Sequence, residues 1–220
     1  ASVTSLSVIV NKTSSVAAPN TVLDFANSAE TINTTDNTAA SRSIATGPTS
    51  PAVTLDVDGD EGVLLQVTTD LTLDVFGFVQ LDGSMAFKKA TGSFILTNGS
   101  THASTALSNV SYLEIGAHVN TAFAGVGSIG FELTDVSFGM VMVSDTKGTV
   151  AATDDVNYMA LKADVGSASL VGIDGLTASV TSLSVIVNKT SSVTAPNTVL
   201  DFANSSETIN TTDTAAASRS

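Results

Sequence analysis

Three aspartates at alternate positions are the residues of this sequence best suited to hold a metal ion. Asp56, Asp58 and Asp60 could direct their carboxylates to one point, and alternate carboxylates of this kind open many Ca²⁺-binding loops. The spacing departs from the EF-hand pattern, because Glu61 replaces the glycine of the loop and Val67 stands where the closing glutamate belongs. Two interpretations therefore remain open. The three aspartates form either a divalent-cation site or the solvated end of a hairpin.

The other residues with catalytic or metal-binding chemistry are scattered. Asp154 and Asp155 form a second acidic candidate, and the two histidines, His102 and His118, lie apart from it and from each other in the sequence. The chain has no cysteine, which excludes a thiolate metal site and a disulfide. Neither a nucleophile-elbow motif nor a phosphate-binding loop is present. The sequence therefore predicts no enzyme, no catalytic residue and no cofactor except the Ca²⁺ ion considered above.

Alternating apolar and polar residues predict β-strands around these positions. Strands are expected at 3–10 and 21–25, and at 53–57 and 63–68, which the turn residues 58–62 would join into a hairpin. A second turn is expected at 88–92, and Gly77 and Gly83 indicate bulges or bends. Further strands are predicted at 71–75, 78–81, 84–87, 93–97, 110–115, 128–143, 158–171 and 176–187.

This pattern predicts an all-β protein. We expect an elongated antiparallel β-sandwich or flattened barrel with long strands, arranged as tandem repeats. A β-solenoid is the alternative, because segments 129–138, 161–170 and 176–185 resemble one another. The turn signals at Gly59, Gly92 and Gly175 lie where antiparallel hairpins need them, and they favour the first arrangement.

The last 43 residues of the chain repeat the first 43. The two copies differ only at the four pairs Ala17/Thr194, Ala29/Ser206, Asn37/Thr214 and Thr38/Ala215. Repetition at a constant offset of 177 residues is typical of a tandem array. We therefore assign 1–25 to the end of a preceding repeat unit, 26–52 to a polar loop or inter-repeat linker, 53–202 to one complete β repeat domain, and 203–220 to the start of the next polar loop or linker.

Composition narrows the classes of partner. The formal net charge is −13, from 21 acidic and 8 basic residues, so a nucleic-acid partner is not expected, because phosphate binding needs clustered lysine and arginine. No apolar run approaches the roughly 18 to 20 residues of a membrane-spanning helix, and membrane insertion is not expected either. With 43% hydrophobic but only 13% charged residues, the composition indicates a folded chain with an uncharged polar surface.

Segments 54–59, 74–88, 158–163 and 169–177 resemble recurring segments in the repeats of very large, adhesin-like bacterial exported proteins. The resemblance covers most of 53–188 and consists of strand patterns. It implies an extracellular, repetitive protein without an enzymatic site. The aspartate-rich calcium nonapeptides typical of neighbouring modules in such proteins are missing from this sequence.

These observations predict a structural tandem repeat of an extracellular bacterial surface fibre, filament or adhesin stalk, without catalysis. Neighbouring repeats of the same protein are the expected partners, with strand exchange through the segment that begins at Ala178 and ends at Asn188. The alternative is a multivalent carbohydrate- or surface-binding module. Such modules usually present aromatic platforms, whereas this chain has no tryptophan and only two tyrosines, Tyr112 and Tyr158.

Overall fold

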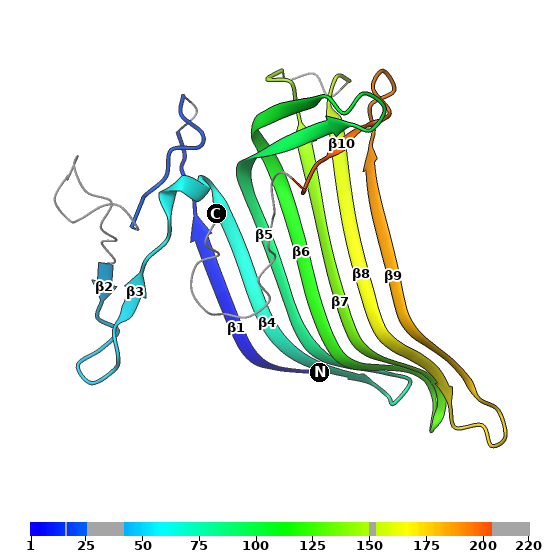
Figure 1. Ribbon diagram of the computed structural model, residues 1–220. Helices are drawn as coiled ribbons and strands as arrows, with labels where there is room; N and C mark the ends of the chain where they lie inside the picture. Colours follow the sequence, from blue (N-terminus) through cyan, green and yellow to red (C-terminus); the bar gives the residue numbers. More distant parts are fainter. Residues whose placement is uncertain (16, 26–41, 150–152, 204–220) are drawn as a thin grey trace.

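The computed structural model describes residues 1–15, 17–25, 42–149 and 153–203, which form an all-β chain (Figure 1). Seven strands lie side by side in the order β1-β4-β5-β6-β7-β8-β9, and β10 joins the same sheet by pairing with β5. β2 and β3 form a separate two-stranded sheet. The elements are β1 (Ser2–Asn11), β2 (Arg42–Ile44), β3 (Val53–Leu55), the 3-10 helix η1 (Gly59–Glu61), β4 (Leu64–Val75), β5 (Val79–Asn98), β6 (Ser104–Val126), β7 (Ile129–Asp145), β8 (Val156–Val171), β9 (Ala178–Thr190) and β10 (Thr198–Leu200).

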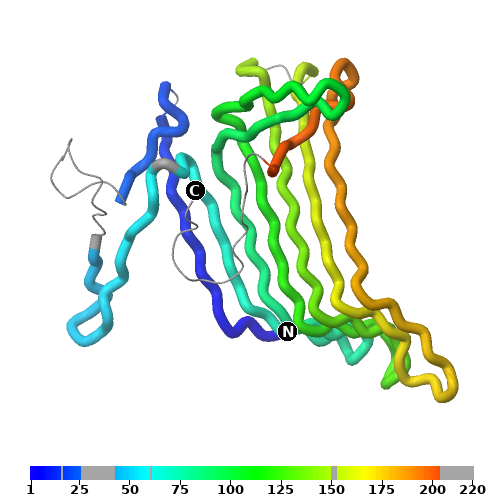
Figure 2. Tube along the Cα trace, viewed as in Figure 1, coloured from blue at the N-terminus to red at the C-terminus, as the bar shows by residue number. Residues whose placement is uncertain are grey.

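The large sheet is antiparallel throughout, which confirms the all-β, antiparallel part of the prediction. Figures 1 and 2 show one curved layer with β1 and β9 at its open edges. The predicted flattened barrel is therefore wrong for the described residues, and the solenoid is also wrong, because neighbouring strands alternate in direction. The second sheet has only two short strands, so this part of the chain does not form a sandwich of comparable sheets. Among the described residues, no helix is long and apolar enough to cross a membrane.

Two predicted hairpins are wrong. β3 pairs with β2, and β4 pairs with β1 and β5, so segments 53–57 and 63–68 are not partners. The expected turn at 88–92 lies inside β5, where Lys88 opposes Glu114 of β6. At 58–62 the chain does turn, through η1, but it connects strands that pair with other partners. At 88–92 the local turn chemistry is overridden by the long β5–β6 ladder. The strands predicted at 78–81, 84–87 and 93–97 are consequently parts of one long strand.

The cross-strand register assigns each side chain to one of two faces. One row of partners is apolar from edge to edge, and we call the face that bears it the outer face; its members are Val8, Val67, Phe87, Ile115, Met140, Leu161 and Val187. The adjacent row lies on the opposite, inner face and mixes apolar with charged residues: Ile9, Gln66, Lys88, Glu114, Val141, Ala160 and Asn188. Successive residues of a strand point to opposite faces, so the alternation read from the sequence gives the sheet two different surfaces.

The hydrophobic core lies at one end of the inner face. There the connected ends of β5 and β6 turn across the sheet beside β10 (Figure 1). Phe94 and Tyr112 pack edge to face with ring centroids 5.3 Å apart, and Leu200 of β10 is only 2% exposed. The other members of the cluster are Leu64, Ala90, Leu96, Val110, Val141, Val143 and Tyr158. Full burial of one such aliphatic side chain contributes about 1.5–3 kcal/mol, so this end stabilises the ladder most strongly.

Glycines allow the long strands to bend. The β5–β6 register shifts between Asp82 and Gly83 and again between Gly92 and Phe94, which confirms the bend predicted at Gly83. A Cβ atom on Gly83 would lie 2.3 Å from the backbone oxygen of His118, so only glycine permits this approach of β6. Gly77 differs, because it lies in the turn between β4 and β5 with a φ of 73°.

We expect Gly83→Ala to lower the free energy of unfolding by about 1–3 kcal/mol, because the added methyl group meets backbone atoms of β6 that cannot rotate away. Urea unfolding followed by circular dichroism measures the change. Gly47→Ala is the matched control, since its Cβ would meet only the Ser50 side chain, at 3.5 Å. Equal unfolding free energies for the two variants would contradict the close approach at Gly83.

We expect Tyr158 to ionise above the ordinary pKa of tyrosine. Burial raises the pKa of its phenol, Lys147 lowers it, and Asp145 raises it further. Because the folded chain favours the neutral phenol, this group stabilises the fold fully below the pKa of unfolded tyrosine. That contribution to the free energy of unfolding is lost as the pH rises through the raised pKa of Tyr158. The chain has no tryptophan and two tyrosines, so Tyr112→Phe leaves Tyr158 as the single source of near-ultraviolet tyrosinate absorbance. Titration of this variant at or below the pKa measured after denaturation would contradict the buried environment.

Candidate functional site

The predicted calcium ligands lie around the short helix η1. Asp56 comes directly after β3 and is exposed, Asp58 is half-buried, and Asp60 lies within η1. The amide of Gly59 donates to Oδ1 of Asp24 at 3.1 Å, which brings a further carboxylate to this segment. Among the described side chains, no group of three His, Cys, Asp or Glu is placed to hold a metal. The side chain of Asp60 lies outside the described part, and the calcium site stays a prediction.

His118 has polar neighbours on the inner face. Its Nδ1 is 3.3 Å from Oγ of Ser137, and its Nε2 is 3.9 Å from Oδ1 of Asp135. In a nucleophilic triad a carboxylate hydrogen-bonds the histidine and fixes its tautomer, whereas here the carboxylate is beyond hydrogen-bond distance. The side chains of His118 and Asp135 are 41% and 75% exposed, so solvent screens their charges. His102 lies in the turn after β5 with a φ of 58°. These arrangements give no support to hydrolysis.

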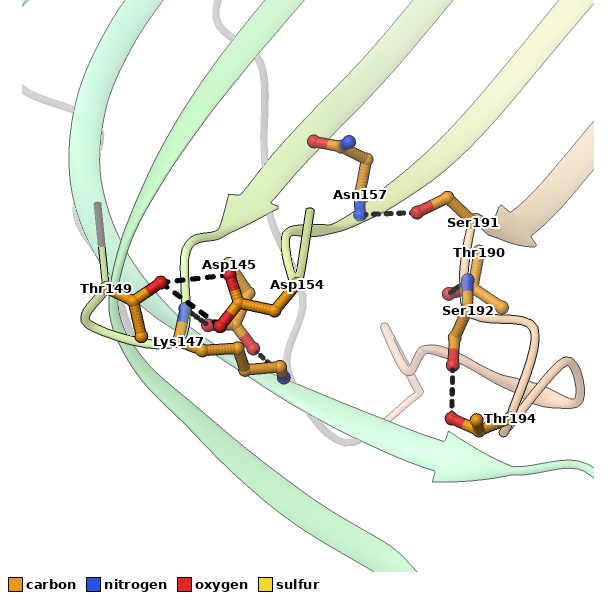
Figure 3. A network of polar contacts seen from close by, with 9 residues as sticks. All are labelled: Asp145, Lys147, Thr149, Asp154, Asn157, Thr190, Ser191, Ser192 and Thr194. Carbon is orange, nitrogen blue, oxygen red and sulfur yellow. Dashed lines mark hydrogen bonds and ion pairs between the residues drawn. The ribbon is translucent and has the colours of Figure 1, made fainter. Parts of the chain in front are cut away.

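The second acidic candidate ties a loop at one end of the sheet, beyond β7 (Figure 3). Thr149 Oγ1 donates to Asp154 at 2.9 Å from Oδ1 and 3.1 Å from Oδ2. Lys147 forms an ion pair with Asp145, and the pKa of Lys147 is raised chiefly by its hydrogen bond to that carboxylate. The contact with Thr149 therefore holds Asp154 close to the residues that follow β7. In the same view, the amide of Asn157 donates to Ser191 Oγ at 2.8 Å, which joins the end of β8 to the residues after β9.

Shallow grooves lie on both faces of the sheet. The groove on the inner face has a volume of about 690 Å³, and its lining includes His118, Lys162, Asp164, Asn188 and Phe202. The hydroxyl of Ser184, and then Lys162, lower the pKa of Asp164, which favours its ionised form. The groove on the outer face has a volume of about 640 Å³ and a more apolar lining that includes Phe87, Leu113, Met142, Met159 and Lys189.

The repeated sequence forms both edge strands of the large sheet. Its first copy provides β1, which pairs with β4, and its second copy provides β9, which pairs with β8. The residues after each strand share one side-chain contact, although only the second copy continues into a short strand, β10. Asn11 Nδ2 donates to the Leu23 carbonyl at 2.6 Å, and Asn188 Nδ2 donates to the Leu200 carbonyl at 2.7 Å. The residues 1–15, 17–25 and 178–202 are therefore one structural motif present twice, and we call it the edge motif.

A serine cap repeats in the same manner. Ser15 Oγ accepts from the Ala18 amide at 3.1 Å, and Ser192 Oγ accepts from the Ala195 amide at the same distance. Each serine amide also donates to the hydroxyl oxygen of the threonine two residues earlier, Thr13 or Thr190, at 3.1 Å. The same capping hydrogen bonds thus form in both copies, although the two copies have different neighbours.

The residues that follow the strand in each copy of the edge motif contact different parts of the chain. In the first copy, the amide of Phe25 donates to the Val57 carbonyl at 2.9 Å, beside the Asp24–Gly59 contact. In the second copy, the amide of Asp201 donates to the Ile95 carbonyl at 2.8 Å, and Thr97 Oγ1 donates to Asp201 Oδ2 at 2.6 Å. One motif therefore has two docking sites, one on the segment between β3 and β4 and one on β5. Sequence repetition identified the motif, but only the pairing of β1 and β9 revealed the two sites.

Comparison of the chain with protein-family models, with curated proteins and with solved structures finds no match.

Proposed function

We propose that this chain is a segment of a structural tandem repeat in an extracellular bacterial surface fibre, filament or adhesin stalk, and that it has no catalytic role. The single observation that carries the proposal is the placement of the edge motif. The same sequence forms β1 at one edge of the sheet and β9 at the other, so the two ends of the folded unit are alike. A unit with matching ends suits repetition, because the next unit can begin where this one finishes.

The dimensions of the strands also support a structural role. β5 has 20 residues and β6 has 23, whereas an average strand has about 5–6. Long antiparallel ladders resist extension along the strands because many backbone hydrogen bonds are loaded together. The described residues offer shallow grooves and a screened histidine, which suit mechanical spacing better than chemistry.

The extracellular location rests on composition and on the resemblance to bacterial exported repeat proteins. The chain is acidic, rich in small polar residues and free of cysteine, so it can be exported unfolded without disulfide chemistry. Calcium would act in such an environment as a structural ion. Asp56, Asp58 and Asp60 remain the residues that we propose for it, with Asp24 at the margin of the same segment.

A multivalent carbohydrate- or surface-binding module is the second candidate. The inner-face groove favours it, because polar side chains there, including Lys162 and Asp164, could hydrogen-bond hydroxyl groups. The absence of tryptophan argues against it. This candidate requires glycan binding that strengthens with the number of units and is lost in Lys162→Ala, and glycan arrays probed with chains of one and three units test both requirements.

We expect chains with several units to form straight rods with a constant rise per unit, because both ends of the unit offer the same edge motif. Electron microscopy of native or multi-unit material measures this rise. A chain that carries only residues 1–177 provides the control, since it lacks the second copy of the motif. Irregular beads with variable spacing would contradict the filament and would favour a flexible stalk that carries separate binding modules.

A further inference from the structure

We propose that the strand β9 belongs to two sheets at once. One of its edges pairs with β8, as in this chain, and the other edge pairs with β4 of the following unit, in the position that β1 occupies here. Successive units would then share one continuous antiparallel sheet. This inference rests on the tandem arrangement proposed above, and it names the occupant of the open edge as a second copy of the same unit.

Strand direction is the first argument. Six antiparallel pairings lead from β1 to β9, so the two strands run the same way. β9 can therefore lie against β4 of a following unit in the direction that β1 already has, and the alternation of the sheet continues without a break. Simple contact between β9 of one unit and β1 of another would instead give a parallel pair inside an antiparallel sheet, which is the less stable ladder.

Side-chain orientation is the second argument. One row of partners runs from Val10 at one edge to Lys189 at the other: Val10, Leu65, Lys89, Leu113, Met142, Met159 and Lys189. The copy of Val10 is Val187, two residues before Lys189. The register of the second copy is thus displaced from that of the first by two residues. An even displacement keeps every side chain on the same face of the sheet. Val8 and Val185 both lie on the outer face, and one strand satisfies both ladders without rotation.

Complementary exposure is the third argument. Leu23 is 66% exposed in the first copy, whereas its equivalent Leu200 is 2% exposed in the core of the sheet. Ile186 is 72% exposed in the second copy, whereas its equivalent Ile9 is half-buried against the core cluster. In each copy, side chains next to a neighbouring strand are buried. The side chains that are exposed in one copy are those that have a neighbour in the other copy. A motif with both neighbours would cover all of these side chains.

The polar contacts of the two copies are compatible. Asp24 accepts from the Gly59 amide through Oδ1, whereas Asp201 accepts from Thr97 through Oδ2 and from the Ala203 amide through Oδ1. Asn20 accepts from Thr91 through Oδ1 at 3.4 Å, whereas its equivalent Asn197 donates to Ser100 through Nδ2 at 2.9 Å. Different atoms of equivalent residues serve the two docking sites, so a single motif can serve both together.

A chain of two units tests the shared strand. In this chain, residues 1–177 precede the full sequence, so the edge motif occurs three times and only the middle copy has a unit on either side. Cysteines at the positions of Ala163 and Val185, which are partners in the β8–β9 ladder, lock the middle strand to the preceding unit by a disulfide. The natural chain has no cysteine, so this is the only disulfide formed. Lys162→Cys with Val185→Cys is the matched control, because residue 162 faces the other side and should not cross-link.

Residue-resolved amide hydrogen exchange on the locked chain then gives the answer. In an edge strand alternate amides point away from the sheet and exchange quickly, as we expect in the first and last copies. We expect both sets of amides to exchange about 100-fold more slowly in the middle copy, because β8 of the preceding unit and β4 of the following unit accept their hydrogen bonds. The axial rise should be about 29 Å, from six inter-strand steps of ~4.8 Å.

The outcomes separate this inference from the proposed function. Fast alternate exchange in the locked middle copy would overturn the shared strand, and a regular rod of a different rise would still leave the filament standing. Slow exchange throughout the middle copy in a chain that forms irregular, flexible beads would support the shared strand locally and overturn the filament. Comparison with the unlocked two-unit chain shows whether the disulfide itself disturbs the fold.

Discussion

Backbone hydrogen bonding at the two open edges is the constraint on which the rest of this structure depends. β1 and β9 each have a partner on one side only within the described residues, so each presents a row of amide and carbonyl groups away from the sheet. Such edges attract further strands unless a loop, a charge or a bulge blocks them. Here the same sequence occupies both edges in the same direction, with β4 to β8 between them. The geometry favours extension of the sheet over closure.

The distribution of apolar side chains explains why extension would also stabilise the sheet. The core is confined to the end where β10 and the turned ends of β5 and β6 cover the inner face. Elsewhere large side chains remain open to solvent, including Phe131 at 62% and Met85 at 44%. A small hydrophobic core beside a large hydrogen-bonded sheet is typical of repeat proteins. In such proteins, contacts between neighbouring units supply much of the stability of each unit.

The sequence predicts the strands better than their partners. Period-two alternation correctly indicates strands in β1 and in β4 to β9, and Gly83 correctly indicates a bend, because both signals are local. The β1–β4 pairing joins segments more than 50 residues apart, and turn residues such as those at 88–92 gave false hairpins. The site shows the same limit. Repetition reveals the edge motif, but the contacts of Asp24 with Gly59 and of Asp201 with Thr97 depend on tertiary packing that no local pattern encodes.

The differences between the two copies of the edge motif bear on its double role. Within residues 1–25 and their equivalents, only Ala17 is replaced, by Thr194. Thr194 lies in the turn, where its hydroxyl is 3.4 Å from Ser192 Oγ, and it takes no part in the β8–β9 or β10–β5 ladder. A strand with a single neighbour could vary on its open side, whereas a strand that serves two ladders is constrained on both. Every paired residue of β1 is identical to its equivalent in β9. A strand that serves two ladders requires this identity.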